Sequence, residues 1–162
     1  MEKYYIEEKS FFQEQKGQDI WNFLMAMIAE KGNEIAIVLP AGDSLEINDP
    51  VLRNPGEFKN LKPIRTLITL RPFLVKNENL HVCHHYPLRQ EILQEMGNEW
   101  LERVRELSIM PCFFKILDEQ GRLVLAMAPQ VSIGLLHPKE AEALTQMGME
   151  LKEWKILLND AI

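Results

Sequence analysis

Three stretches of the chain repeat hydrophobic residues every three or four positions, which is the spacing of one face of a helix. The first extends from about residue 11 to residue 31 and stops at Gly32, a common residue just after a helix end. The second begins at or just after Pro87, and the third begins at Pro138. The hydrophobic positions are Trp21, Leu24, Met25 and Ile28 in the first, Leu88, Ile92, Met96, Trp100, Val104 and Leu107 in the second, and Leu144, Met147, Leu151, Trp154 and Leu158 in the third.

Segments rich in β-branched residues lie between these helices and predict strands. The segment EIAIVLP is one strand, and the arms IRTLITLRPFLVK and LHVCHHY form a hairpin turned at Asn77–Asn79. Pro72 cannot donate to a ladder, so we expect the first arm to lie at an edge or to carry a bulge. The segment PCFFKILDEQGRLVLAMAP predicts a second hairpin, with its turn at Asp118–Gly121 and a left-handed Gly121.

Residues 41–63 carry three prolines, two glycines and three asparagines, which predicts a long irregular loop with at most a short strand at Leu45–Ile47. We expect this loop to be the most mobile internal segment and the first to be cut by proteases. Its apolar residues include Leu52 and Phe58, which either attach the loop to the core or order against a bound partner.

The order of the elements predicts an α+β fold. We expect an antiparallel sheet of about five strands with three helices, in the order α-β-(loop/β)-β-β-α-β-β-α. The 162 residues are enough for one domain with its own core and too few for two, so residues 1–162 are predicted to form a single domain.

Composition narrows the class of protein. Hydrophobic residues make up 46% and charged residues 26%, as in an ordinary folded domain. The net charge of −6 argues against nucleic acid or an anionic membrane as the main partner. The N-terminus is acidic and aromatic, unlike a signal peptide. The apolar run Ile20–Ala29 is about half as long as a membrane span. The two cysteines do not indicate a disulfide framework. We therefore expect a soluble, cytoplasmic domain.

The segment NLHVCHHYPL holds three of the four histidines and one of the two cysteines. On a strand, His81, Cys83 and His85 would point to one face and His84 to the other, so three candidate metal ligands share a face. Same-face neighbours stand about 6.5–7 Å apart, whereas zinc lies about 2.0–2.3 Å from each ligand atom. These three side chains therefore converge poorly, and the alternative is a strand whose imidazoles form hydrogen bonds and whose Cys83 is a small core residue.

Other catalytic chemistry finds little support in the sequence. A cysteine nucleophile needs a basic neighbour, but Cys83 and the adjacent His84 would face opposite ways, and Cys112 is flanked by apolar residues. The chain contains no phosphate-binding glycine loop, no Gly-x-Ser-x-Gly motif and no His-Glu-x-x-His motif. We expect no cofactor and no enzymatic activity.

The hairpin FFKILDEQGRLVLAMA and the predicted helix KEAEALTQMGMELKEW, taken with the order of the elements, resemble those of class I type III secretion chaperones. Those chaperones are small, acidic, cytoplasmic domains with a helix, three strands, a helix, two strands and a closing helix. The resemblance implies a homodimer in which the second helix, here the one with Met96 and Trp100, pairs across the interface.

We therefore expect a non-enzymatic, chaperone- or adaptor-like domain that binds another protein or a second copy of itself, and holds a partner segment on an apolar surface. Candidate contact residues are Met96, Trp100, Leu52 and Phe58. Two alternatives stay open: a metal-binding protein or metal-dependent enzyme using His81, Cys83 and His85, and an immunity or inhibitor protein that acts through an acidic face.

Overall fold

A computed structural model describes residues 2–7, 14–42, 62–70, 80–101, 113–128, 131–136, 138–149 and 151–153. Eight strands and three helical segments lie within these ranges. The strands are β1 (Glu2–Glu7), β2 (Glu34–Gly42), β3 (Arg65–Thr69), β4 (Leu80–Pro87), β5 (Phe113–Leu117), β6 (Leu123–Ala128), β7 (Val131–Leu136) and β8 (Lys152–Glu153). The helices are α1 (Glu14–Lys31), α3 (Gln90–Glu95), which continues into a π-helical turn (Met96–Trp100), and α5 (Pro138–Gln146).

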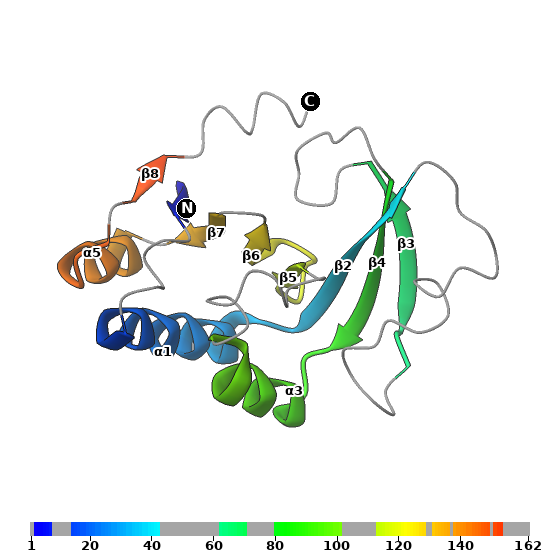
Figure 1. The fold of residues 1–162 in the computed structure, drawn as a ribbon, viewed down its shortest axis with the longest axis horizontal. Coiled ribbons are helices and arrows are strands. Elements are labelled where there is room, and N and C mark those ends of the chain that lie inside the picture. The colour runs from blue at the N-terminus through cyan, green and yellow to red at the C-terminus, as the bar shows by residue number, and fades with distance from the viewer. Residues whose placement is uncertain are drawn as a thin grey trace.

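The described strands form one sheet in the order β3-β4-β2-β5-β6-β7-β1-β8, and every neighbouring pair is antiparallel (Figure 1). The predicted α+β class is confirmed, with its three helices and an antiparallel sheet. The five expected strands are β2 to β6, and β1, β7 and β8 extend the sheet beyond them. β3 lies at one end of the sheet, which confirms the edge position expected for the first hairpin arm.

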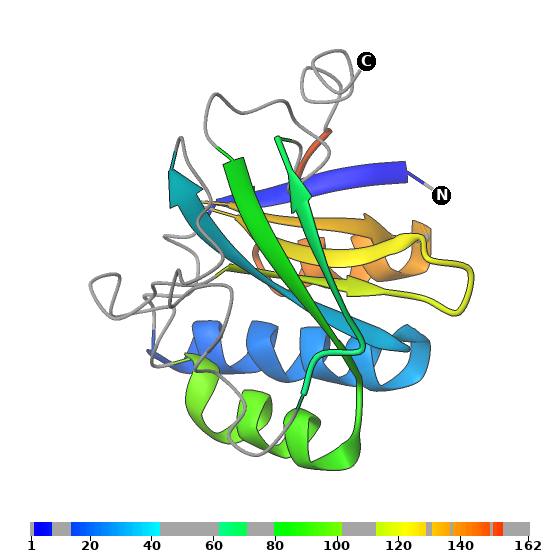
Figure 2. The same ribbon diagram turned by 90° about the vertical axis from the view of Figure 1, so that its right-hand side faces the viewer.

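The three helices contribute to one hydrophobic core on a single face of the sheet. α1 and α3 lie side by side against this face (Figure 2). Strand residues alternate, so Ile35 and Ile37 of β2 point into this core, whereas Glu34, Ala36 and Val38 belong to the opposite face. The fully buried side chains of the core include Ile20, Trp21, Leu24, Ile28, Ile35, Ile37, Tyr86, Ile92, Phe114 and Ile116.

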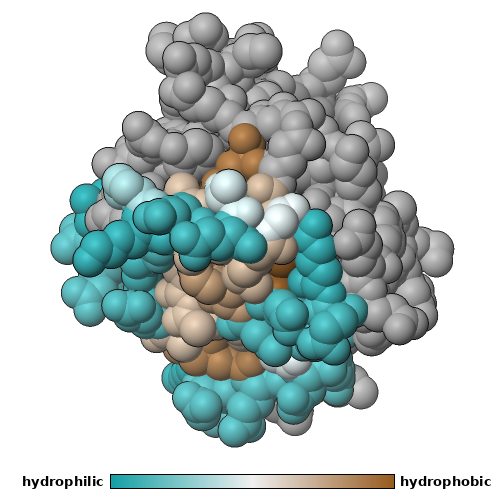
Figure 3. Space-filling view, turned by 90° about the vertical axis from the view of Figure 1, so that its left-hand side faces the viewer, coloured by the Kyte–Doolittle hydropathy of each residue, from teal (hydrophilic) through white to brown (hydrophobic). Residues whose placement is uncertain are grey.

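α1 is joined to its neighbours by two polar contacts at different positions. The indole Nε1 of Trp21 donates a buried hydrogen bond of 3.1 Å to the backbone carbonyl of Met96, where the π-helical turn begins. Lys31, in the last turn of α1, forms an ion pair of 2.6 Å with Glu140 of α5. On the side of the molecule where α1 and α5 lie, polar residues flank an apolar strip of the described surface (Figure 3).

The closing helix is shorter than its hydrophobic repeat predicts. It ends at Gln146 because Gly148 adopts a left-handed conformation with φ of 85°, and the amide of Met149 bonds back to the carbonyl of Leu144 at 3.0 Å. The chain then turns, and Lys152–Glu153 pair with β1 as β8. The expected helical stripe is therefore wrong at Leu151, and Trp154 and Leu158 lie outside the described residues.

Two features predicted at glycines are confirmed: the end of the first helix before Gly32 and the hairpin turn at Gly121. α1 ends at Lys31, and a Cβ on Gly32 would lie 2.6 Å from the carbonyl oxygen of Ile28, so the close approach of the backbone requires glycine there. Gly121 has φ of 77° in the β5–β6 turn, as predicted.

None of the helices in the described ranges is both long and apolar enough to cross a bilayer.

Replacing Trp21 with Phe tests the link between α1 and α3. The substitution removes the indole donor and leaves the buried carbonyl of Met96 without it, so the free energy of unfolding should fall by about 1 to 3 kcal/mol. Urea denaturation measures this change. Gln18→Ala is the control, because it removes only an exposed hydrogen bond to Asn22 on the same helix. An equal loss in both variants would contradict the assigned role of the indole.

Candidate functional site

The histidine-rich strand β4 lies between β2 and the edge strand β3. Its register places Cys83 opposite Val38 and Leu67, and places His85 opposite Ala36 and Arg65. His84 is opposite Ile37, which belongs to the helix-side core. The predicted alternation is therefore confirmed: Cys83 and His85 share the face away from the helices, and His84 belongs to the other.

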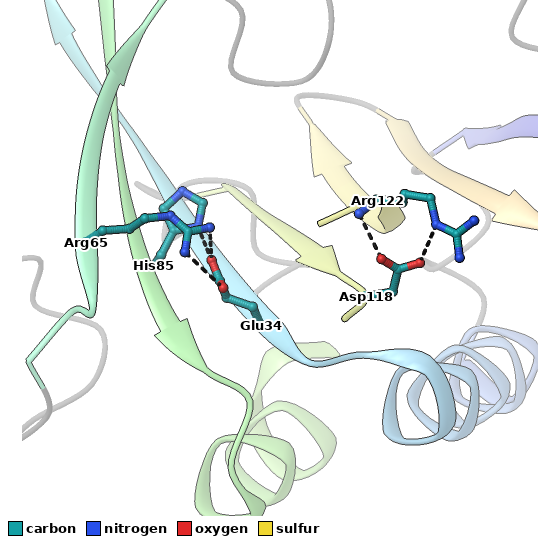
Figure 4. Close-up of polar contacts among 5 residues, drawn as sticks. All are labelled: Glu34, Arg65, His85, Asp118 and Arg122. Carbon is teal, nitrogen blue, oxygen red and sulfur yellow. Dashed lines mark hydrogen bonds and ion pairs between the residues drawn. The ribbon is translucent and has the colours of Figure 1, made fainter. Parts of the chain in front are cut away.

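On the face away from the helices, Glu34, Arg65 and His85 form a compact polar cluster, one residue from each of three adjacent strands (Figure 4). The Oε1 atom of Glu34 lies 2.5 Å from His85 Nδ1 and 2.5 Å from an Arg65 guanidinium nitrogen. A second guanidinium nitrogen donates to Oε2 at 3.2 Å. The carboxylate thus binds Arg65 through both oxygens and His85 through one.

The proton on His85 follows from this geometry. Arg65 Nη2 lies 3.2 Å from His85 Nδ1, but a guanidinium can only donate and a carboxylate can only accept. Because Nδ1 lies within hydrogen-bond distance of the Glu34 carboxylate, Nδ1 carries the proton of the ring and donates a hydrogen bond to Oε1. The other ring nitrogen, Nε2, is then an acceptor. It is buried and has no hydrogen-bond partner among the described residues.

Burial lowers the pKa of His85 below its ordinary value, and the nearby cations Arg65 and Lys115 lower it further. The hydrogen bond and negative charge of Glu34 oppose this shift but do not overcome it. Burial also raises the pKa of the Cys83 thiol, against a smaller effect from Lys115. Cys83 is therefore a protonated, buried core residue, as the non-catalytic interpretation expected.

A second polar contact holds β3 from the helix side of the sheet. The hydroxyl of Thr66 and His84 Nδ1 lie 2.9 Å apart and share a hydrogen bond. β3 is consequently attached to β4 by its ladder and by Thr66 on one face, and Arg65 attaches it to Glu34 of β2 on the other.

The metal hypothesis gains no support from this arrangement. Within the described part of the chain, no three His, Cys, Asp or Glu side chains are placed to hold a metal ion. The Nδ1–H of His85 donates a hydrogen bond to Glu34, and Arg65 and Lys115 add positive charge nearby, which disfavours a cation. Cys112 and His137, the remaining cysteine and histidine of the chain outside this strand, lie outside the described residues.

β3 exposes large apolar side chains at the edge of the sheet. Leu67 and Ile68 are 48% and 51% exposed, and Ile64 and Leu70 at its two ends are 56% and 39% exposed. Only β4, among the described strands, pairs with β3. Apolar side chains therefore project from both faces of a strand whose outer side no described strand occupies.

The remaining predicted contact residues fall elsewhere. Met96 is completely buried beside α1, so the expectation that its side chain forms a self-association surface is wrong: it packs in the core of its own chain. The side chain of Trp100, the residues Leu52 and Phe58, and residues 43–61 of the predicted loop lie outside the described part of the structure. The residues that the sequence analysis missed are Glu34, Arg65 and the exposed apolar residues of β3. The sequence signal for an edge strand was Pro72, which follows β3 in the same hairpin arm and cannot donate a ladder hydrogen bond.

The buried, neutral His85 predicts how stability depends on pH. Unfolded histidine has a pKa of about 6.5, and folding lowers the pKa of His85, so below pH 6.5 the unfolded chain binds more protons. The contribution of His85 is therefore fully present above about pH 6.5 and is lost as the pH falls below this value and through the lowered pKa of the folded chain. Urea denaturation between pH 5 and 7.5 should show this decline, and His85→Gln should flatten it. An unchanged slope in His85→Gln would contradict the assignment.

Glu34→Gln tests whether the cluster holds the edge strand. Removing the charge weakens charge-assisted hydrogen bonds worth about 1.5–3 kcal/mol, so amide hydrogen exchange in β3 should accelerate by about tenfold or more. Asp118→Asn is the matched control, because it disturbs the Asp118–Arg122 ion pair of the β5–β6 turn (Figure 4) and should leave β3 unchanged. Equal exchange rates in β3 for Glu34→Gln and the wild type would refute this role.

Comparison with known proteins finds no matching family model, no matching curated protein and no matching solved structure. The likeness to class I type III secretion chaperones therefore remains a prediction from the order of the elements.

Proposed function

We propose that this chain is a non-enzymatic, chaperone- or adaptor-like domain that binds a partner protein by adding an extended segment of it to β3. One observation carries the proposal: the edge strand exposes apolar side chains on both faces, with Leu67 at 48% and Ile68 at 51%. Exposed apolar edge strands are uncommon in monomeric proteins, because they pair readily with other chains.

The chemistry of an edge strand specifies the kind of partner. The outer side of an edge strand presents N–H donors and C=O acceptors at strand spacing, and an extended peptide satisfies both. Among the described strands, none pairs with the outer side of β3. Alternate side chains of the partner would pack beside Leu67 on one face and beside Ile68 on the other. A segment with apolar residues at alternating positions fits this edge.

The polar contacts beneath β3 favour binding. Arg65 and Thr66 fix the strand before a partner arrives, so little conformational entropy is lost in ordering it. Glu34 also neutralises Arg65, so the edge carries no uncompensated charge among its described residues. The net charge of −6 disfavours nucleic acid as the partner, which supports a protein.

A peptide library tests the proposal, because it samples many candidate partner sequences at once. Random peptides about ten residues long, enough for one strand, should yield binders with alternating apolar residues. Leu67→Lys replaces an apolar contact worth about 1.5–3 kcal/mol with a charge, so binding should weaken by about tenfold or more.

Gln94→Lys provides the control for this experiment. It adds the same charge at an exposed position of α3, away from the edge, and should keep the wild-type affinity. Binders that ignore Leu67→Lys, or a library that gives no binders to the wild type, would overturn the proposal.

A further inference from the structure

We infer that the strand that pairs with β3 is the β3 of a second copy of this chain, so that two sheets join edge to edge across a two-fold axis at Leu67. This inference rests on the proposed function and names the partner. It differs from the arrangement expected from the sequence, in which the second helix pairs across the dimer.

The length of β3 selects the register. The strand runs from Arg65 to Thr69, and an antiparallel pair of two such strands matches all five residues only when Leu67 is at the centre. In that register Leu67 lies opposite its own copy, Thr66 opposite Ile68, and Arg65 opposite Thr69. Ile64 and Leu70, both exposed, extend the pairing with one apolar contact at each end.

Charge favours a second copy at this edge. Two chains of net charge −6 repel one another over most of their surface, so they approach most easily where the surface is neutral. Arg65 is the only charged residue from Ile64 to Leu70, and Glu34 of its own chain binds it. The central register also avoids placing Arg65 opposite its own copy, so no like charges meet directly across the pair.

The apolar side chains complement themselves across the axis. In an isologous pair each contact occurs twice, once on each side of the two-fold axis. Ile64 of each copy therefore contacts Leu70 of the other, and the two Leu67 side chains contact each other at the centre. The edge is short, and an interface of this length is small compared with that of a stable dimer. The dimer should therefore be weak and in exchange with monomer at micromolar concentrations.

Disulfide trapping tests the register directly. Directly opposed residues of an antiparallel pair have Cα atoms about 4.5–5.5 Å apart, within the range of a disulfide, so Leu67→Cys should cross-link to its own copy under mild oxidation. Ile68→Cys is the matched control, because it is equally exposed but faces Thr66. Leu67→Cys should give at least about fivefold more covalent dimer than Ile68→Cys. The wild type, which retains Cys83 and Cys112, gives the background.

Sedimentation velocity of the full chain completes the test. The wild type should shift from monomer towards dimer across the micromolar range, and Leu67→Lys should remain monomeric with an unchanged circular dichroism spectrum. Equal cross-linking of the two cysteine variants, or a dimer that persists in Leu67→Lys, would overturn self-pairing at β3. A monomeric wild type that still binds peptides through Leu67 would also overturn self-pairing while leaving the proposed function intact. A wild type that neither forms a dimer nor binds peptides would refute both self-pairing and the proposed function.

Discussion

The carboxylate of Glu34 ties the edge strand β3 to β2, in addition to the ladder that joins β3 to β4. β3 has five residues and one described neighbour, and four of its five side chains are exposed, so hydrophobic burial stabilises it little. Glu34 on β2 meets Arg65 of β3 across β4 and binds His85 between them. Its side chain is 12% exposed and that of His85 is 3% exposed, so salt screens this cluster less than an ordinary surface ion pair.

Two adjacent histidines of β4 connect this strand to its two neighbours, the edge strand β3 and the interior strand β2. His84 points to the helix side and shares a hydrogen bond with Thr66, whereas His85 points away from the helices and binds Glu34. The two imidazoles thus hold the neighbouring strands on opposite faces. Burial disfavours a charged His85, and a protonated ring would also stand beside Arg65 and Lys115, so the pKa is lowered and the neutral form is favoured in the folded chain.

The sequence predicted those features that depend on local patterns. The α1 and α3 helices, the five strands β2 to β6 and the glycine turn at Gly121 all follow from hydrophobic period or backbone preference. The helical repeat in the C-terminal segment continues past Gly148, so the period alone could not show that the chain stops there. β1 was missed because its partner β7 is distant in sequence, and a short strand has little pattern of its own. The Glu34–His85 contact joins residues 51 positions apart, and no spacing rule detects it.

The polar cluster and the apolar edge are physically linked through strand alternation. A slip of one residue in β3 would turn every side chain to the opposite face, and a weakly held edge strand is prone to such slips. The contacts of Arg65 with Glu34 and of Thr66 with His84 forbid the slip from both faces at once. They therefore decide that Leu67 is presented on the face away from the helices and Ile68 on the helix side. The buried imidazoles of His84 and His85 therefore help to fix which face of the sheet each exposed side chain of β3 occupies, although they do not reach the outer edge themselves.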